Sequence, residues 1–197
     1  MARKNSRDTK GKIISAAWEL FYEQGYEETT VDEIVELSGT SKGSFYHYFE
    51  SKDALLGTLS YMFDKKYEEL EPELGKFSSC FDKLIYLNKE LFGMIEDGIS
   101  LELLARLFST QLVTKGEKHL LDRNRQYYKL LRKITQEGQD KGEFRDDITV
   151  SELVKLYAIV ERGMMYEWCI RDGEYSLKKY GEENMPFMIS RFLKNNF

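Results

Sequence analysis

The chain has 197 residues, a formal net charge of −5 and a hydrophobic fraction of 42%, which suffices for a buried core and excludes wholesale disorder. No stretch approaches the ~18 consecutive apolar residues of a membrane-spanning helix, and residues 1–12 lack the apolar core of a secretion signal. Two isolated cysteines, Cys80 and Cys169, give neither a disulfide framework nor metal-ligand spacing, so we expect a cytoplasmic protein without a bound metal or cofactor.

Two prolines, long amphipathic stretches and the lack of alternating apolar runs predict an all-α protein. The first 12 residues form an N-terminal arm with five basic residues and one acidic residue. Such an arm suits contacts with phosphate groups, although a solvated tail has the same composition. The apolar spacing of residues 7–24 predicts a first helix, which Gly25 ends.

The stretch from residue 29 to residue 56 carries the strongest local signals. Thr30 and Glu33 have the spacing of a capping box, in which the hydroxyl accepts the Glu33 N–H and the carboxylate reaches back to the Thr30 N–H. Gly39 stands where the first short helix must end in a left-handed conformation, and Thr40 or Ser41 then caps a second helix. Two helices joined by so short a turn form a helix-turn-helix.

The second short helix is expected to bury one face and expose the other. At 100° per residue, Phe45 and Phe49 lie about 40° apart and must point to the interior. Gly43 costs about 1 kcal/mol of helix stability, but it leaves room for a close approach, and the free N–H groups of a helix start attract anions. The outer face is small, polar or hydrogen-bonding and comprises Lys42, Gly43, Ser44, Tyr46 and His47.

This stretch resembles the DNA-binding signature of the tetracycline-repressor (TetR) family of bacterial transcription regulators. The residues that match the signature, after a pair of threonines, are Gly39, Ser41, Gly43, Ser44, Tyr46, Phe49, Lys52 and Leu55. The match extends upstream through Ile13, Ile14, Ala17, Phe21, Gly25 and Tyr26. Ser38 and Thr40 stand where the family more often has Ala and Val, which bears on the DNA that is read. The resemblance is specific over the first quarter of the chain and topological beyond it.

In a helix-turn-helix dimer, two recognition helices enter successive major grooves, and most contacts are made to phosphate. We predict phosphate contacts from three residues. Thr30 lies at a helix end, Tyr46 offers a hydroxyl, and Lys52 carries a positive charge. Base-edge contacts are predicted for Lys42, Ser44 and His47, and contacts of His47 with the DNA backbone alone are nearly as plausible. Tyr46 has the alternative role of an ordinary surface tyrosine. Ser41 and Gly43 complete the predicted DNA-binding set.

Helices continue to the end of the chain. One is expected from Ser51 to about Leu70, before Pro72. Others are expected over residues 81–98, over residues 103–108, and from about residue 120 to a glycine at position 138 or 142. In the final segment, residues 176–195, a break is predicted near residues 184–186.

The helix predicted over residues 150–171 carries two apolar stripes rather than one. One stripe, with Leu153 and Trp168 at its ends, can pack within the chain. The other stripe either packs against a partner or is buried because the helix is covered on two sides within a monomer. A glycine in this stripe would permit another helix to approach closely. The resemblance implies a homodimer that forms through the last two helices, which favours the partner. The predicted interface residues are Leu156, Ile159, Gly163, Tyr166 and Ile170.

The resemblance also implies that the C-terminal part encloses a pocket for a small, often apolar or aromatic inducer. The side chains proposed to line it are large and adaptable, although ordinary core packing explains any one of them equally simply. They are Phe92, Phe108, Tyr127, Tyr128, Met164 and Trp168.

Residues 1–50 are therefore predicted to form a three-helix DNA-binding domain with a basic arm, and residues 51–197 a larger helical bundle for ligand binding and dimerisation, with about nine helices in all. The predicted function is a repressor that a small molecule releases from a near-palindromic operator. A helical ligand-binding or scaffolding protein that uses its helix-turn-helix for protein contacts is the alternative. An enzyme is not expected, because the chain has two histidines and lacks a phosphate-binding glycine loop, a metal-ligand cluster and a nucleophile elbow.

Overall fold

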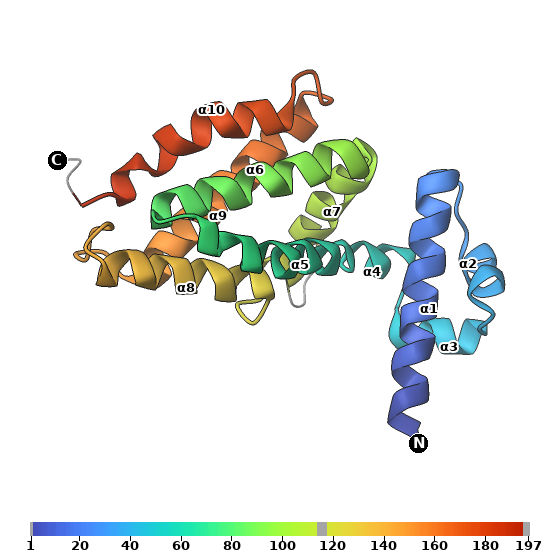
Figure 1. Ribbon diagram of the computed structural model, residues 1–197. Helices are drawn as coiled ribbons and strands as arrows, with labels where there is room; N and C mark the ends of the chain where they lie inside the picture. The colour runs from blue at the N-terminus through green and yellow to red at the C-terminus, as the bar shows by residue number, and fades with distance from the viewer. Residues whose placement is uncertain (1, 114–117, 195–197) are drawn as a thin grey trace. The chain divides into compact units, whose positions relative to one another are not determined.

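The computed structural model describes residues 2–113 and 118–194, with side chains from residue 9 onward. The regular secondary structure of these residues is helical, and the one β-type pairing among them is an isolated bridge between Phe144 and Leu193, which confirms the predicted all-α class (Figure 1). Ten α-helices and three 3-10 helices fall within it. No helix among these residues has the length and apolar character needed to cross a membrane.

The chain forms two compact units. Residues up to Ser60 belong to the first unit together with residues 106–120, and the second unit holds residues 61–105 and the chain from Leu121 onward. The functional boundary predicted at residue 50 stays a prediction. The helices of the first unit are α1 (Ala2–Glu23), α2 (Val31–Ser38), α3 (Lys42–Tyr48) and α4 (Lys52–Leu56).

A small apolar core holds the first unit together. Helix α1 packs against both α2 and α3. Its backbone is helical from Ala2, so the segment predicted as an arm continues the first helix, while the basic side chains of residues 1–8 lie outside the described residues. The side chains buried in this core include Ile13, Ala17, Phe21, Ile34, Phe45 and Leu55.

The prediction of a single helix from Ser51 to Leu70 is wrong, because the helix is interrupted between α4 and α5 (Leu59–Leu70). The Thr58 hydroxyl donates to the Leu55 carbonyl at 2.5 Å and accepts the Trp18 indole N–H at 2.8 Å. Hydroxyls bonded to nearby carbonyls compete with the helical backbone bonds, which explains the break. Pro72 then lies in the 3-10 helix η1 (Glu71–Lys76).

The second unit is a ring of four helices. Helix α6 packs on α10 and α8, and α9 closes the ring because it contacts both α8 and α10 (Figure 1). Leu120, which was predicted to begin α8, lies instead in the 3-10 helix η2 (His119–Leu121). The four helices are α6 (Cys80–Gly98), α8 (Gln126–Asp140), α9 (Val150–Ile170) and α10 (Leu177–Ile189). Helix α7 (Leu101–Val113) begins in the second unit and ends in the first.

The break predicted near residues 184–186 is also wrong, because α10 continues through Pro186. Packing against α6 explains this continuity. A Cβ atom at Gly181 would lie 2.5 Å from the Phe92 ring, so the two helices approach closely at this glycine. Met185 and Ile189 are fully buried on the same helix. Their burial offsets the backbone hydrogen bond that the proline cannot make.

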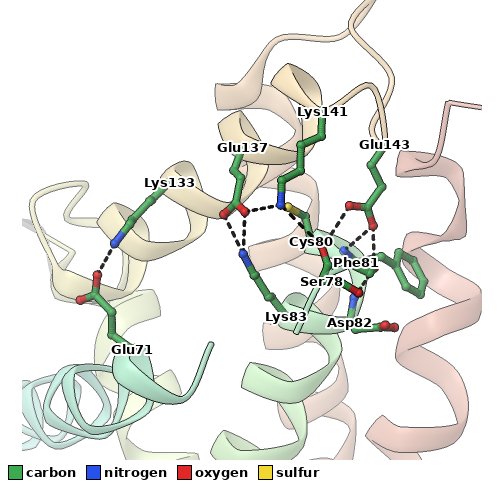
Figure 2. Close-up of polar contacts among 11 residues, drawn as sticks. Glu71, Ser78, Cys80, Phe81, Asp82, Lys83, Lys133, Glu137, Lys141 and Glu143 are labelled. Carbon is green, nitrogen blue, oxygen red and sulfur yellow. Dashed lines mark hydrogen bonds and ion pairs between the residues drawn. The ribbon is translucent and has the colours of Figure 1, made fainter. Parts of the chain in front are cut away.

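Charged side chains fasten the start of α6 to the end of α8 (Figure 2). Glu143 accepts hydrogen bonds from the Ser79 hydroxyl at 2.6 Å and from the Cys80 and Phe81 N–H groups at 2.7 and 2.9 Å. A carboxylate thereby caps the positive end of α6 from a distant part of the chain. Lys141 and Lys83 both donate to Glu137, and their bonds lower the pKa of its carboxyl to about 2.

A second charged pair is buried where α5 meets the start of α8. Asp64 accepts from the Arg125 guanidinium at 3.0 and 3.2 Å and from the Tyr127 N–H at 3.1 Å. Because two charges with complementary hydrogen bonds replace water here, the pair fixes the position of α5 against α8.

The centre of the ring holds an acidic side chain without a basic hydrogen-bond partner. Glu161 is 1% exposed and accepts one hydrogen bond, from the Asn88 amide at 3.1 Å. Burial raises the pKa of its carboxyl, and the Asn88 amide and the nearby hydroxyls of Tyr127 and Tyr157 oppose the rise. The hydroxyls of Tyr67 and Tyr127, which are buried in the same unit, have no hydrogen-bond partner of good geometry. These two hydroxyls and Glu161 form the polar centre of the second unit.

We predict that Glu161→Gln stabilises the protein at neutral and alkaline pH. A raised pKa means that the folded state holds the proton more tightly than the unfolded state, so stability falls as the pH rises above the ordinary carboxyl value. Glutamine removes this penalty, keeps an acceptor for Asn88 and brings an N–H group for a tyrosine hydroxyl. Thermal unfolding should show a midpoint raised by a few degrees at about pH 8 and by less at about pH 5.

The control is Glu167→Gln on the same helix, which removes only a surface ion pair with Arg171. Its midpoint should move little. A Glu161→Gln protein less stable than the parent at both pH values would show that the fold needs the carboxyl group itself and would contradict the prediction.

Candidate nucleic-acid interface

Helix α2 begins and ends as the sequence predicts. The Thr30 hydroxyl accepts the Glu33 N–H at 3.3 Å, and the Glu33 carboxylate accepts the Thr30 N–H at 2.7 Å. At the other end, Gly39 has φ +61°, a left-handed conformation that a side chain would strain. Its N–H donates to the Glu36 carbonyl at 3.1 Å, which completes the turn into α3.

Of the two residues predicted to begin α3, the structure selects Ser41. The Ser44 N–H donates to the Ser41 hydroxyl oxygen at 3.1 Å, and the two hydroxyls lie 3.0 Å apart. Thr40 belongs to the turn, where its hydroxyl lies 2.8 Å from that of Ser38. A serine cap leaves the remaining N–H groups of the first turn directed outward.

Two phenylalanines determine which face of α3 is exposed. Phe45 is fully buried and Phe49 is 5% exposed, with ring centroids 5.8 Å apart, as predicted. Tyr46, by contrast, is 56% exposed. The outer face consists of exposed Lys42, Gly43, Tyr46 and His47, with Ser44 half-buried at its edge.

On the outer face, packing within the chain does not require a glycine at position 43. A Cβ atom built there would meet only the Ser41 hydroxyl oxygen, at 3.8 Å. The fold therefore accommodates a larger side chain at this position. Glycine keeps the start of α3 bare, which suits close contact with a partner that lies outside the chain.

The positive charge of Lys42 at the start of α3 is held by one exposed ion pair. Lys42 contacts Asp32 of α2 at 2.7 Å, and both side chains are more than half exposed. The hydrogen bond to Asp32 raises the pKa of the Lys42 ammonium, which is therefore positively charged at neutral pH. Ion pairs this exposed contribute little to stability, so phosphate can replace Asp32 at small cost. The His47 ring rests against Tyr48, with centroids 4.7 Å apart.

Lys52 has a structural role that the sequence did not reveal. Its ammonium donates to the backbone carbonyls of Tyr26 and Thr29 at 2.6 and 2.8 Å and to that of Glu27 at 3.3 Å. It also lies 4.2 Å from the centre of the Tyr26 ring. These contacts fasten the α1–α2 loop, and hence the cap of α2, to the start of α4. All three ammonium hydrogens of Lys52 therefore have partners within the chain. A contact of Lys52 with phosphate stays a prediction.

The middle of α7 meets the same loop, a contact that no local sequence signal predicts. The Arg106 guanidinium lies 4.8 Å from the centre of the Tyr26 ring and forms an ion pair with Glu27. The Tyr26 hydroxyl in turn donates to Asp53 of α4. Tyr26 is thus the point at which α1, α4 and α7 come together in the first unit.

The apolar stripe predicted for dimerisation is exposed on α9. Leu156, Ile159 and Tyr166 are 44%, 48% and 48% exposed, and Ile170 is 58% exposed. A Cβ atom at Gly163 would meet nothing within 4 Å. The companion stripe, including Leu153, packs inside the second unit. One stripe therefore packs within the chain and the other is exposed, and its contact with a partner stays a prediction.

The residues predicted to line an effector pocket are dispersed. Tyr127 and Tyr128 are in ring contact, with centroids 4.8 Å apart. Phe92 lies instead against α10, and the Trp168 indole N–H donates to the Tyr175 carbonyl at 2.7 Å. Met164 is buried on α9, and Phe108 is half-buried in the part of α7 that belongs to the first unit. Ligand contact at these six positions stays a prediction.

Two family models together match most of the chain. The model of bacterial regulatory proteins of the tetR family matches residues 13–66, and the model of the C-terminal region of YsiA-like protein matches residues 61–191. The fatty acid metabolism regulator protein of Bacillus subtilis (strain 168) is 22% identical over 188 residues, covering 95% of this chain and 97% of that protein. The transcriptional repressor KstR2 of Mycobacterium tuberculosis is 24% identical over 202 residues, covering 96% and 94%.

Solved structures share the fold. FadR from Bacillus subtilis in complex with stearoyl-CoA superposes with a TM-score of 0.70 at 22% identity, covering 92% of this chain and 98% of that one. FadR from Thermus thermophilus, a TetR family repressor in complex with lauroyl-CoA, gives a TM-score of 0.74 at 22% identity, covering 93% and 94%. The likeness confirms the predicted order of an N-terminal helix-turn-helix and a helical bundle.

We predict that Lys52→Ala lowers the free energy of unfolding by roughly 2 kcal/mol, because three carbonyls lose a charged donor. Urea denaturation measures the loss, and Lys42→Ala, which removes only an exposed pair, is the control with little expected change. The salt dependence of DNA binding by the same variant tests the phosphate contact, whose loss would reduce the slope by about 1. Unfolding at the parental urea concentration would contradict the structural role.

Proposed function

Because this chain belongs to the TetR family of bacterial regulatory proteins, we propose that it is a homodimeric DNA-binding transcription regulator, and specifically a repressor, controlled by a small molecule. The observation that carries the proposal is the outer face of α3. Phe45 and Phe49 hold this helix by its inner side, and the small and polar outer side is left exposed. A helix presented in this way fits the major groove of DNA.

The exposed stripe on α9 supports the dimer. Four large apolar or aromatic side chains around Gly163 would otherwise remain in water, and a second copy of the same face can cover them by two-fold symmetry. Two α3 helices then meet DNA about 34–36 Å apart, so the operator is a near-palindrome. The protein acts in the cytoplasm, where its DNA lies.

For the effector we propose a fatty acyl-coenzyme A thioester. Two solved neighbours are complexes with stearoyl-CoA and lauroyl-CoA, which makes this class the first to test. The side chains buried inside the four-helix ring are mostly apolar, which suits contact with an acyl chain. Its polar centre, where the Tyr67 hydroxyl has no hydrogen-bond partner of good geometry, offers a donor to a carbonyl or amide group of such a ligand.

Helix α7 is a continuous element that belongs to both units, and we propose that it transmits effector binding to the DNA-binding unit. It begins in the second unit, and its Arg106 contacts Tyr26 and Glu27 beside the cap of α2 in the first. A ligand that prefers one position of α7 therefore favours one position of the helix-turn-helix. The coupling equals the difference in ligand affinity between the two geometries, commonly ~1–3 kcal/mol.

Selection of DNA from a pool of random duplexes, followed by gel shifts at two salt concentrations, tests the proposal. A near-palindromic duplex should emerge, its affinity should fall steeply with salt, and lauroyl-CoA should release it. Lauric acid and free coenzyme A are the effector controls. Selection of no common sequence, or binding that ignores salt, would instead favour a scaffolding protein that uses the helix-turn-helix for protein contacts.

A further inference from the structure

A groove of about 360 Å³ runs along the seam between α8 and α9 in the second unit. Its walls carry four basic side chains, two from each side of the seam, above a floor that includes Val154 and the ring of Tyr128. The basic residues are Arg123, Arg132, Lys155 and Arg162.

These four cations have no acidic partner at ion-pair distance among the described residues. Arg132 donates to the Arg123 backbone carbonyl at 2.9 Å, and Arg162 donates to the Tyr128 hydroxyl at 3.1 Å. Both bonds position a guanidinium without neutralising it. In a chain with a net charge of −5, most other basic side chains described here do meet a carboxylate, so the groove concentrates unbalanced positive charge.

Two acidic side chains feel the charge of a groove residue, Glu152 that of Lys155 and Glu161 that of Arg162, and both are hydrogen-bonded elsewhere. Glu152, which lies close enough to Lys155 to feel its charge, is held by the Thr149 hydroxyl and N–H in the capping box of α9. Glu161 points into the polar centre of the unit, where Asn88 binds it. An anion from outside the chain would therefore relieve the mutual repulsion of the like charges in the groove.

We propose that this groove binds the phosphate groups of the coenzyme A thioester. The inference rests on the proposed effector. Guanidinium groups match phosphate oxygens in pairs, and several cations around one space suit a diphosphate better than a single carboxylate. The apolar part of the lining suits an organic phosphate over an inorganic ion, because Leu121 and Ile159 are 53% and 48% exposed there and part of such a ligand covers them.

The position of the groove gives the bound anion a way to act on the dimer. Ile159 belongs both to the groove wall and to the exposed stripe of α9. An anion that neutralises the groove lies at the edge of the proposed dimer face, where it alters the repulsion between the two copies. The effector thereby acts on the spacing of the two α3 helices.

Calorimetric titration of the full-length double variant Arg123→Gln/Lys155→Gln tests the proposal. Neither side chain makes a hydrogen bond or ion pair within the described part of the chain, so the fold should survive. The matched control is Lys65→Gln/Lys129→Gln, which removes two exposed charges of the second unit outside the groove, from side chains that likewise make no ion pair among the described residues. Lauroyl-CoA and free coenzyme A should bind the groove variant at least about tenfold more weakly than the parent, and lauric acid should bind both equally.

Each other outcome overturns the proposal. Equal weakening in the groove variant and its control would show a general effect of charge. Loss of pyrophosphate binding with unchanged coenzyme A binding would assign the groove to free phosphate. Loss of the dimer would assign it to acidic side chains of the second copy. If lauroyl-CoA still releases DNA from the groove variant at the parental concentration, the proposed function stands and the groove assignment fails. If lauroyl-CoA neither binds nor acts on the parent, the effector class fails as well.

Discussion

The burial of Phe45 and Phe49 is the constraint on which the DNA-binding unit depends. A helix of seven residues has few backbone bonds of its own, so its orientation comes from the side that it packs. The two rings fix that side against α1, and the capping bonds of Thr30 and Ser41 fix the two helix starts. Lys52 then holds the loop that precedes α2. Every other property of the outer face, including its exposure, follows from this anchoring.

Charge in the second unit falls into two classes with different consequences. Asp64 and Arg125 pair in the interior, and Glu137 and Glu143 bind lysines or helix N–H groups, so these groups determine how the helices meet. Glu161 and the four basic side chains of the groove make no ion pair among the described residues. Compensated charge stabilises the ring, whereas uncompensated charge costs stability until something outside the chain balances it. For this reason the seam of α8 and α9 is where we expect a ligand to act.

The parts of the fold that could be predicted are those set by local chemistry. The capping box, the left-handed Gly39, the buried phenylalanines and the two stripes of α9 all follow from residues a few positions apart. The errors arose where packing decides: Thr58 breaks a helix because Trp18 reaches it, and Pro186 remains helical because Gly181 seats α10 on α6. The roles of Lys52 and Arg106, and the meeting of four cations in one groove, depend on segments distant in sequence, so no spacing rule indicates them.

The most direct test of the central claim is Gly43→Ala, measured for both stability and affinity toward the selected duplex. Because the nearest atom to the added methyl group is the Ser41 hydroxyl oxygen at 3.8 Å, the fold should tolerate it, and helix propensity should leave stability equal or up to about 1 kcal/mol higher. The same methyl group on the face that meets DNA should lower affinity at least about tenfold, a loss of ~1.4 kcal/mol. Gly98→Ala, also without close neighbours, is the control, and its affinity should not change. A folded Gly43→Ala protein that binds the duplex as tightly as the parent would contradict the claim that this face enters the groove.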